Sequence, residues 1–347
     1  MSKLYFATIF NINYLSRARA MIDSLAEHHQ DFVMFVVALD KDTELFFKGK
    51  QFENVRVITT TDIAAAFPEL VAIKNERSFV NYIFTLSPYY PLYILQNNPE
   101  IPHICSLDTD QFFFSSPQKI FDLLDKYSVL ITPHRFTKKL LATDIEKYGK
   151  FNVSFQVFKN DRIGLKCLQH WKEQCALWCA DQEEDGKFAD QKYLDEWPSQ
   201  FGNSVGEISH VGLGLAPWNI NNQVVSVKNK KIWVGDQPLV LFHYQGLRIL
   251  EELFVYTAFD SYLASMTPVI KKQILKPILK SIFAIQGYNP DNIARNKNAF
   301  SAVEVKPESK SSYFKFIKGE MFTFEQYLQM KNIKSGTLGR VKKFFGK

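Results

Sequence analysis

The sequence predicts an α/β fold in which a mostly parallel sheet is covered by helices. Short continuous apolar runs alternate along the chain with segments that place apolar residues at helical spacing, which is typical of a parallel sheet buried on both faces. The composition, 46% hydrophobic with 31 Phe and 15 Tyr, is that of a folded globular protein. A length of 347 residues fits one large α/β domain with an appendage, or two domains.

The N-terminal part of the chain shows this alternation most clearly. Leu4–Phe10 is predicted as a buried strand, residues 16–29 have the apolar spacing of a helix, and residues 32–39 form an apolar run that ends at Asp40. Further strands are predicted over 55–59, 104–107, 128–132 and 153–158, and further helices over 79–95, broken around Pro88 and Pro91, and over 163–180. Polar residues that directly follow the strands are expected at the ligand-binding edge of such a sheet.

The charge distribution divides the chain near residue 250. Residues 1–250 hold 26 Lys and Arg against 28 Asp and Glu, a net of −2, whereas residues 251–347 hold 16 against 8, a net of +8. We therefore expect an α/β domain over 1–250 and a basic, mainly helical extension over 251–347. Two alternatives stand for the basic amphipathic segments 270–283 and 338–345: helices at a membrane surface, or ordinary solvated surface of helices packed on the domain. Nucleic acid is not expected as a partner, because no binding module is recognisable.

The termini and the cysteines indicate a cytoplasmic protein. The N-terminus lacks the apolar segment and cleavage site of a signal peptide, and no window is apolar enough to span a bilayer. None of the four cysteines forms a C-x-x-C pair, so we expect reduced thiols. For Cys175 and Cys179, four residues apart on a predicted helix, packing is favoured over a metal or redox role.

Asp108-Thr109-Asp110 directly follows the apolar run 104–107 and precedes three phenylalanines. Carboxylates at positions i and i+2 of an extended chain point to the same side, so both can reach one hard cation. Such a tripeptide is more often a solvated loop. Here, however, burial of unpaired carboxylates between apolar segments would cost several kcal/mol, and a metal ion would remove that penalty.

Two further constellations carry polar side chains. Asp190-Gln191 combines an acceptor with an amide, which suits the binding of sugar hydroxyls; the alternative is that Asp190 caps a helix. His243 ends a strand that begins at Pro238. It is either a hydrogen-bonded structural residue or the nitrogen ligand that completes an O/O/N set with the two aspartates on Mn²⁺ or Mg²⁺. Arg248 lies close enough in sequence to meet phosphate charge.

The order of these pieces resembles glycosyltransferase family 8 and similar bacterial nucleotide-diphospho-sugar transferases of the GT-A fold. The resemblance covers about residues 1–250. It rests on Asn13-Tyr14 after the first strand, Leu107-Asp-Thr-Asp110, Phe151-Asn152-Val-Ser-Phe, Asp190-Gln191 and His243-x-x-Gly246, with Ile131-Thr-Pro-His134 and Pro217-Trp218-Asn219 as further marks of the bacterial relatives. It implies a mixed, mostly parallel sheet with flanking helices.

The resemblance also implies roles for individual residues. Asp108, Asp110 and His243 match the metal ligands, and Asp108 also matches a residue that contacts the nucleotide-sugar. Tyr14 matches the aromatic residue that stacks on uracil. Thr8 and Asn11 are implied to lie nearby in the nucleotide cleft. Asn152 and the pair Asp190-Gln191 match residues that hold the donor sugar and approach its anomeric carbon, and the resemblance makes Asp190 and Gln191 the candidate catalytic residues.

The chain departs from the family pattern at three places. Ser154 stands where a glycine is usual, and Ser87-Pro88 stands where many relatives have a cation, with Arg77 or Lys74 as substitutes. The Lys-Pro-Trp expected after Gly246 is absent, and Arg248 is the candidate to contact the diphosphate in its place.

The expected function is the metal-dependent transfer of a sugar, with retention of configuration, from a UDP-sugar to a glycan or lipid-linked acceptor, as in bacterial surface polysaccharide synthesis. If the basic extension binds lipid, we expect it at the inner face of the cytoplasmic membrane. Three alternatives stay open. One is a nucleotide-sugar or glycan-binding protein with a decayed transferase domain. A sugar nucleotidyltransferase would need a Gly-rich phosphate loop after the first strand, which is missing. An inverting transferase would need a carboxylate base, for which residues 181–185 offer candidates.

Overall fold

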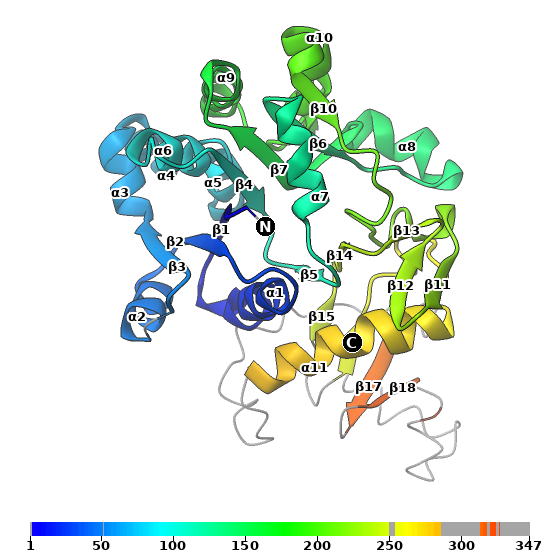
Figure 1. Ribbon diagram of the computed structural model, residues 1–347. Helices are drawn as coiled ribbons and strands as arrows, with labels where there is room; N and C mark the ends of the chain where they lie inside the picture. Colours follow the sequence, from blue (N-terminus) through cyan, green and yellow to red (C-terminus); the bar gives the residue numbers. More distant parts are fainter. Residues whose placement is uncertain are drawn as a thin grey trace.

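The computed structural model describes residues 2–50, 52–249, 254–285, 313–317, 320–323 and 326. Its centre is a seven-stranded sheet of order β10-β6-β7-β4-β1-β2-β3 (Figure 1). The strands are β1 Leu4–Phe10, β2 Phe32–Ala38, β3 Val55–Thr59, β4 His103–Leu107, β6 Val129–Pro133, β7 Phe151–Lys159 and β10 Val205–Glu207. Only β7 runs antiparallel to its two neighbours, β4 and β6. The predicted mixed, mostly parallel sheet is therefore confirmed.

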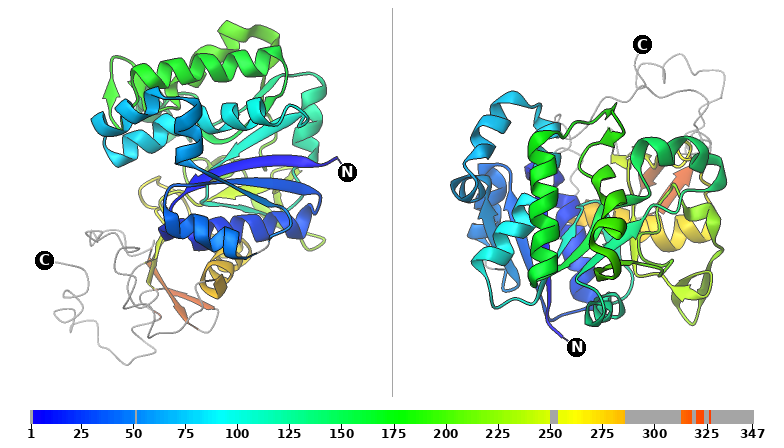
Figure 2. Two further views of the ribbon diagram at one scale, coloured as in Figure 1. Left: turned by 90° about the vertical axis from the view of Figure 1, so that its left-hand side faces the viewer. Right: turned by 90° about the horizontal axis from the view of Figure 1, so that it is seen from above.

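Helices cover both faces of this sheet, as the left view of Figure 2 shows. The helices along the chain are α1 Leu15–His28, α2 Lys41–Gly49, α3 Thr60–Ala66, α4 Glu69–Glu76, α5 Phe79–Leu86, α6 Tyr89–Asn97, α7 Gln118–Phe121, α8 Lys138–Tyr148, α9 Arg162–Leu177, α10 Trp197–Phe201 and α11 Lys276–Ile285. Apolar residues of α1, α2 and α7 form one core with the sheet, and those of α3 to α6 and α9 form the other. Successive strand residues alternate between these two cores because strand side chains alternate in direction.

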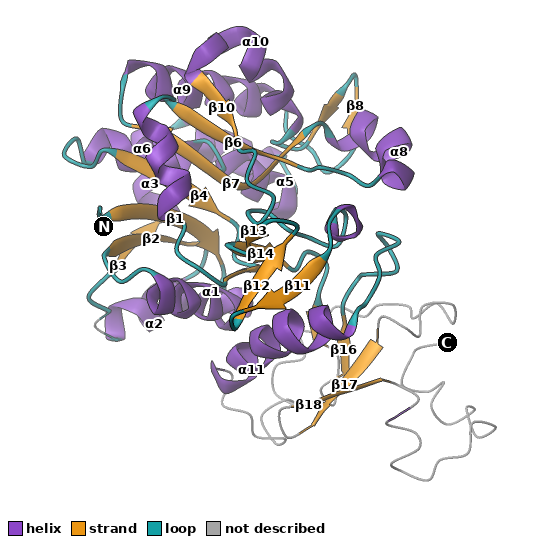
Figure 3. Cartoon of the chain, turned by 45° about the vertical axis from the view of Figure 1, so that its right-hand side comes forward, coloured by secondary structure: helices purple, strands orange, loops and turns teal. Residues whose placement is uncertain are grey.

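Smaller sheets accompany the central one (Figure 3). These are the pair β5 Gln111–Phe113 with β14 Leu241–His243; β11 Val225–Lys228, β12 Lys231–Val234 and β13 Gln237–Pro238; β15 Arg248–Ile249, β16 Phe254–Tyr256, β17 Tyr313–Ile317 and β18 Glu320–Thr323; and the hairpin β8 Glu183–Glu184 with β9 Lys187–Phe188. The pairing of β5 with β14 brings together segments that lie about 130 residues apart in sequence. This pair is the one that positions the candidate site.

The segment 270–283 packs on the rest of the molecule. Its apolar side chains Ile270, Ile274, Leu275, Ile278, Leu279, Ile282 and Phe283 are buried in a core shared with Phe112 of β5 and Phe242 of β14. Helix α11 also contacts α1. Of the two alternatives for this segment, the buried apolar face favours packing on the domain over contact with a membrane. The similar segment 338–345 lies outside the described residues.

Other local predictions are also confirmed. The break around Pro88 separates α5 from α6, and Pro91 lies in the first turn of α6, where its missing N–H removes no helix hydrogen bond. All four cysteines are free and buried, as expected for packing residues. No helix among the described residues is long and apolar enough to cross a bilayer.

Candidate metal centre and its surroundings

Three polar side chains from two distant segments converge at the ends of β4 and β14. Asp108 and Asp110 lie on the turn between β4 and β5, and His243 is the last residue of β14. The antiparallel register pairs His243 with Gln111, the residue directly after Asp110. The backbone N–H of Tyr244 donates to the Asp110 carbonyl at 3.0 Å. The strand pairing therefore places the imidazole beside the two carboxylates.

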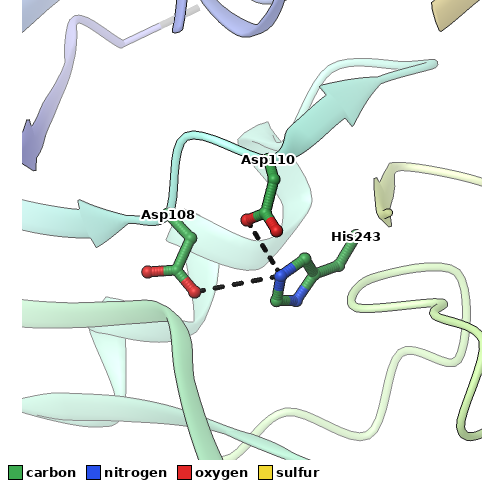
Figure 4. A group of neighbouring side chains, drawn as sticks. All are labelled: Asp108, Asp110 and His243. Carbon is green, nitrogen blue, oxygen red and sulfur yellow. Dashed lines mark ion pairs between the residues drawn. The ribbon is translucent and has the colours of Figure 1, made fainter. Parts of the chain in front are cut away.

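The geometry of these three side chains fits a divalent cation. His243 Nε2 lies 3.0 Å from Asp110 Oδ1 and 3.9 Å from Asp108 Oδ2, and one ligand atom from each residue lies within 4.8 Å of the others (Figure 4). In an octahedral site with metal–ligand distances of about 2.1 Å, adjacent ligand atoms are about 3.0 Å apart and opposite ones about 4.2 Å. The cluster is the one group of three such His, Cys, Asp or Glu residues among those that the structure describes.

Charges within the cluster are strongly coupled. Burial acts to raise the pKa of Asp110, but the charge and hydrogen bond of His243 and the charge of Arg17 outweigh burial and hold that pKa below its usual range. Burial acts to lower the pKa of His243, but the charge and hydrogen bond of Asp110 and the charge of Asp108 together outweigh burial and raise that pKa. Desolvation raises the pKa of Asp108, with Asp110 adding to this shift and His243 opposing it. An anionic pocket of this kind attracts a cation.

The Asp108–Asp110 turn is anchored on β7. The carbonyl of Ser154 accepts the backbone N–H of Asp108 at 3.2 Å and the side-chain amide of Gln111 at 2.5 Å. Gln111 is fully buried, so this second bond is formed away from water, where hydrogen bonds are strong. Both carboxylates are thus carried on a turn that is fixed at each end.

Asp190 is almost completely buried, and it does not cap a helix. The short 3-10 helix beside it, Lys192–Glu196, begins two residues later without a side-chain cap, so the alternative prediction of a helix cap is wrong. Burial, with a smaller contribution from the charge of Asp108, raises the pKa of Asp190 to about 7, and the hydrogen bond that the Ser87 hydroxyl donates to the carboxyl acts in the opposite direction. Oδ2 of Asp190 has no hydrogen-bond partner among the described residues.

The neighbouring amides are held by the backbone or by a serine. Gln191 Nε2 donates to the Tyr148 carbonyl at 2.8 Å. Asn152 is buried, and its Oδ1 accepts the backbone N–H of Ser154 at 3.1 Å and also the Ser154 hydroxyl. The Ser154 side chain, which stands where a glycine was expected, is therefore turned toward Asn152. Nδ2 of Asn152 has no partner in the described part of the chain.

The residues expected to contact a nucleotide surround the end of β1. Asn11 caps the short 3-10 helix Ile12–Tyr14 by accepting the N–H of Asn13 at 3.2 Å. Tyr14 is 47% exposed, and Thr8 is fully buried within β1, with no hydrogen-bond partner for its hydroxyl among the described residues. Arg248 lies on β15 with an exposed side chain. The structure thus leaves the Tyr14 ring accessible and keeps Thr8 inside the sheet.

Arg77, suggested as a substitute cation, is committed elsewhere. Its guanidinium donates to Thr85 Oγ1 and to the carbonyls of Cys175 and Ala176 at the end of α9. These carbonyls have no partner within the helix, so Arg77 satisfies them as a helix C-terminal cap.

The two motifs around His134 and Trp218 meet beside His243. The His134 carbonyl accepts Trp218 Nε1 at 2.8 Å and Asn219 Nδ2 at 2.9 Å. The Trp218 ring lies edge-on to the His243 ring, with the centroids 5.1 Å apart and the planes at 87°. This packing helps to fix the orientation of the imidazole.

Tyr262, which the sequence did not single out, reaches this region from the C-terminal segment. Its ring lies 5.8 Å from that of Trp218, and burial raises its pKa to about 12, with the Asp110 charge contributing. Asn221 holds the surrounding loop by donating to the Leu263 carbonyl at 2.9 Å and accepting the Ser265 N–H at 3.0 Å. No sequence signal connects residue 262 to residue 110.

Arg17 is a second residue that the sequence did not single out. It lies in the first turn of α1, its Nη2 donates to the Leu247 carbonyl at 3.3 Å, and its charge acts on Asp110. Its position one helical turn after Tyr14 is the signal that could have found it.

The chain was compared with protein families, with curated proteins and with solved structures. No family model matches it. It is 28% identical to the uncharacterized protein YfnD of Bacillus subtilis over 254 residues, 73% of this chain and 80% of YfnD. Among solved structures it is similar to mouse xyloside xylosyltransferase 1, with 12% identity, a TM-score of 0.42 and coverage of 71% of this chain and 98% of that chain. It is also similar to the galactosyltransferase LgtC in complex with donor and acceptor sugar analogs, with 13% identity, a TM-score of 0.46 and coverage of 70% of this chain and 87% of LgtC. A third similar structure is the glycosyltransferase GlyE of Streptococcus pneumoniae, with 11% identity, a TM-score of 0.46 and coverage of 88% of this chain and 66% of GlyE.

A second curated relative is the uncharacterized protein YfnF of Bacillus subtilis. The chain is 30% identical to it over 252 residues, which cover 71% of this chain and 82% of YfnF. At this identity and coverage, the chain belongs to the protein family of Bacillus subtilis YfnF.

Proposed function

We propose that this protein is a metal-dependent glycosyltransferase that moves a sugar from a nucleotide-sugar to a glycan or lipid-linked acceptor. The observation that carries the proposal is the convergence of Asp108, Asp110 and His243, within 4.8 Å of one another, at the end of the central sheet. Two carboxylates and an imidazole are a donor set for a divalent cation, and the nitrogen ligand favours Mn²⁺ over Mg²⁺. Such a cation supplies electrostatic stabilisation of a leaving diphosphate.

The donor is proposed to be a UDP-sugar. The exposed ring of Tyr14 lies directly after β1 and offers a stacking surface for uracil, and Asn11 lies beside it. The sugar would then lie near Asp190 and Asn152, each of which has a buried polar atom without a partner among the described residues. Asp190 Oδ2 can accept a sugar hydroxyl, and Asn152 Nδ2 can donate to one.

We propose that the anomeric configuration is retained. Gln191 is held through Nε2 by the Tyr148 carbonyl, and an amide oxygen is too weakly basic to be a good covalent nucleophile. The acceptor hydroxyl would instead attack from the face that the diphosphate leaves. The bond from the anomeric carbon to the diphosphate oxygen breaks, the bond to the acceptor oxygen forms, and the hydroxyl proton passes to the diphosphate.

The acceptor is proposed to be a bacterial surface glycan or its lipid-linked precursor, reached from the cytoplasmic side of the membrane. The buried apolar face of 270–283 does not offer a membrane-binding surface. Any peripheral contact with lipid is therefore assigned to other parts of the basic extension.

A panel of nucleotide-sugars tests the proposal through thermal stability, because a ligand that binds only the folded state raises Tm. We expect one UDP-sugar to raise Tm with Mn²⁺ and to lose this effect with EDTA. Asp110→Asn and His243→Ala should abolish the shift, whereas Asp42→Asn, an exposed carboxylate on α2, should preserve it. A shift that survives EDTA, or survives both site variants, would contradict the metal site. Binding without release of free UDP would indicate a non-catalytic nucleotide-sugar binder.

A further inference from the structure

Arg17 is held between the two regions that the proposed donor must contact. Its guanidinium carbon lies 5.2 Å from the centroid of the Tyr14 ring. On its other side, Nη2 donates to the Leu247 carbonyl at 3.3 Å. Half-buried in the first turn of α1, the side chain covers part of Tyr14 and reaches the turn that follows His243.

That turn is connected to the candidate metal ligands by backbone hydrogen bonds. Leu247 N–H donates to the Tyr244 carbonyl at 3.0 Å, and Tyr244 N–H donates to the Asp110 carbonyl at 3.0 Å. The guanidinium therefore lies between the base-stacking ring and the metal ligands.

We propose that Arg17 binds the diphosphate of the nucleotide donor, an inference that rests on the proposed function. A base on Tyr14 and a cation on Asp110 and His243 require the diphosphate to cross the space between them, where Arg17 lies. Two carboxylates and a sugar diphosphate together carry about four negative charges, and a divalent cation offsets only two of them. A guanidinium has five N–H donors in a planar arrangement that matches phosphate oxygens, and the bond to Leu247 uses one of them.

Arg248 is the competing cation, and its surroundings differ. Its side chain is exposed on β15, opposite Tyr256 in the strand pairing. Its charge acts on Tyr256, which hydrogen-bonds to Ser261. The structure therefore assigns the diphosphate to Arg17 in preference to Arg248.

The test compares the binding of UDP and of uridine, both measured with Mn²⁺. Uridine carries the base but no phosphate, so the ratio of the two Kd values isolates the diphosphate contribution. We expect Arg17→Ala to weaken UDP binding by about 10-fold to 100-fold, the range of a charge-assisted hydrogen bond, and to leave uridine binding unchanged. Arg17→Lys should recover part of the loss. Arg19→Ala is the matched control, because that guanidinium on the same helix pairs with Asp23 and covers Phe52.

The outcomes separate this inference from the proposed function. If the wild-type protein binds neither UDP nor uridine, both fail. If it binds UDP and Arg17→Ala binds UDP equally well, the inference alone is overturned. Equal losses for UDP and uridine would also overturn it, since they would show that Arg17 only supports Tyr14. A loss seen in Arg248→Ala and absent from Arg17→Ala would transfer the role to Arg248.

Discussion

Replacement of Asp190 by Asn should stabilise the protein in a strongly pH-dependent way. The carboxyl is almost completely buried, and its pKa is raised to about 7 in the folded protein, against about 3.9 in an unfolded chain. A raised acid pKa means that the folded state binds the proton more tightly, so stability falls as pH rises from about 4 to 7. A shift of about three pKa units corresponds to about 4 kcal/mol of destabilisation above pH 8, but to only about 1–2 kcal/mol at pH 5.

The substituted amide would carry no charge at either pH, while its oxygen could still accept from Ser87. Relative to wild type, the free energy of unfolding of Asp190→Asn should therefore be increased more at pH 8 than at pH 5, by about 2–3 kcal/mol. Urea denaturation at the two pH values measures this difference, with Asp42→Asn as an exposed control. The same variant should lose transfer activity, because residues of a functional site often lower the stability of the folded protein while serving its activity. If the stability difference between Asp190→Asn and wild type is the same at both pH values, the reasoning that Asp190 is buried with a raised pKa is refuted.

Three further changes test separate parts of the structure. Arg77→Lys should lower the free energy of unfolding by about 1–3 kcal/mol by removing the cap on α9, without changing the Kd for UDP; a weaker Kd would give Arg77 a binding role. Gly149→Ala should cost about 1–3 kcal/mol in urea denaturation, because its φ is +85° and a Cβ would lie 3.0 Å from the Asp195 carboxylate; wild-type stability would contradict this turn. Ile278→Asp should lower Tm strongly, and the exposed control Lys280→Asp should not; equal effects would argue against the packing of α11.

The central sheet was predictable because its signals are local. Leu4–Phe10 and Val55–Thr59 were predicted with the bounds that the structure shows, since short runs rich in apolar and β-branched residues mark strands. The short strand Gln111–Phe113 was not predicted, because three residues carry no periodicity. Its identity depends on pairing with Leu241–His243, a contact between distant segments.

The candidate site was predictable where residues follow strands, and less so elsewhere. Asp108, Asp110 and His243 could be named because each lies at the end of an apolar run. The prediction that Asp190 caps a helix was wrong, because the helix begins two residues later and the carboxyl turns into the interior. The contacts of Arg17 with Leu247 and of Tyr262 with Trp218 join distant segments. The position of Arg17 one helical turn after Tyr14 is a local signal for it, whereas no local pattern records the contact of Tyr262.

The release of UDP from a UDP-sugar in the presence of Mn²⁺ tests the central claim most directly. A coupled assay over a panel of UDP-sugars should detect release with at least one donor in the wild-type protein. That release should disappear with EDTA and in Asp110→Asn and His243→Ala, and it should persist in Asp42→Asn. If the wild-type protein releases no UDP from any donor, or if the two site variants release UDP as fast as the wild type, a metal-dependent transferase centred on Asp108, Asp110 and His243 is contradicted.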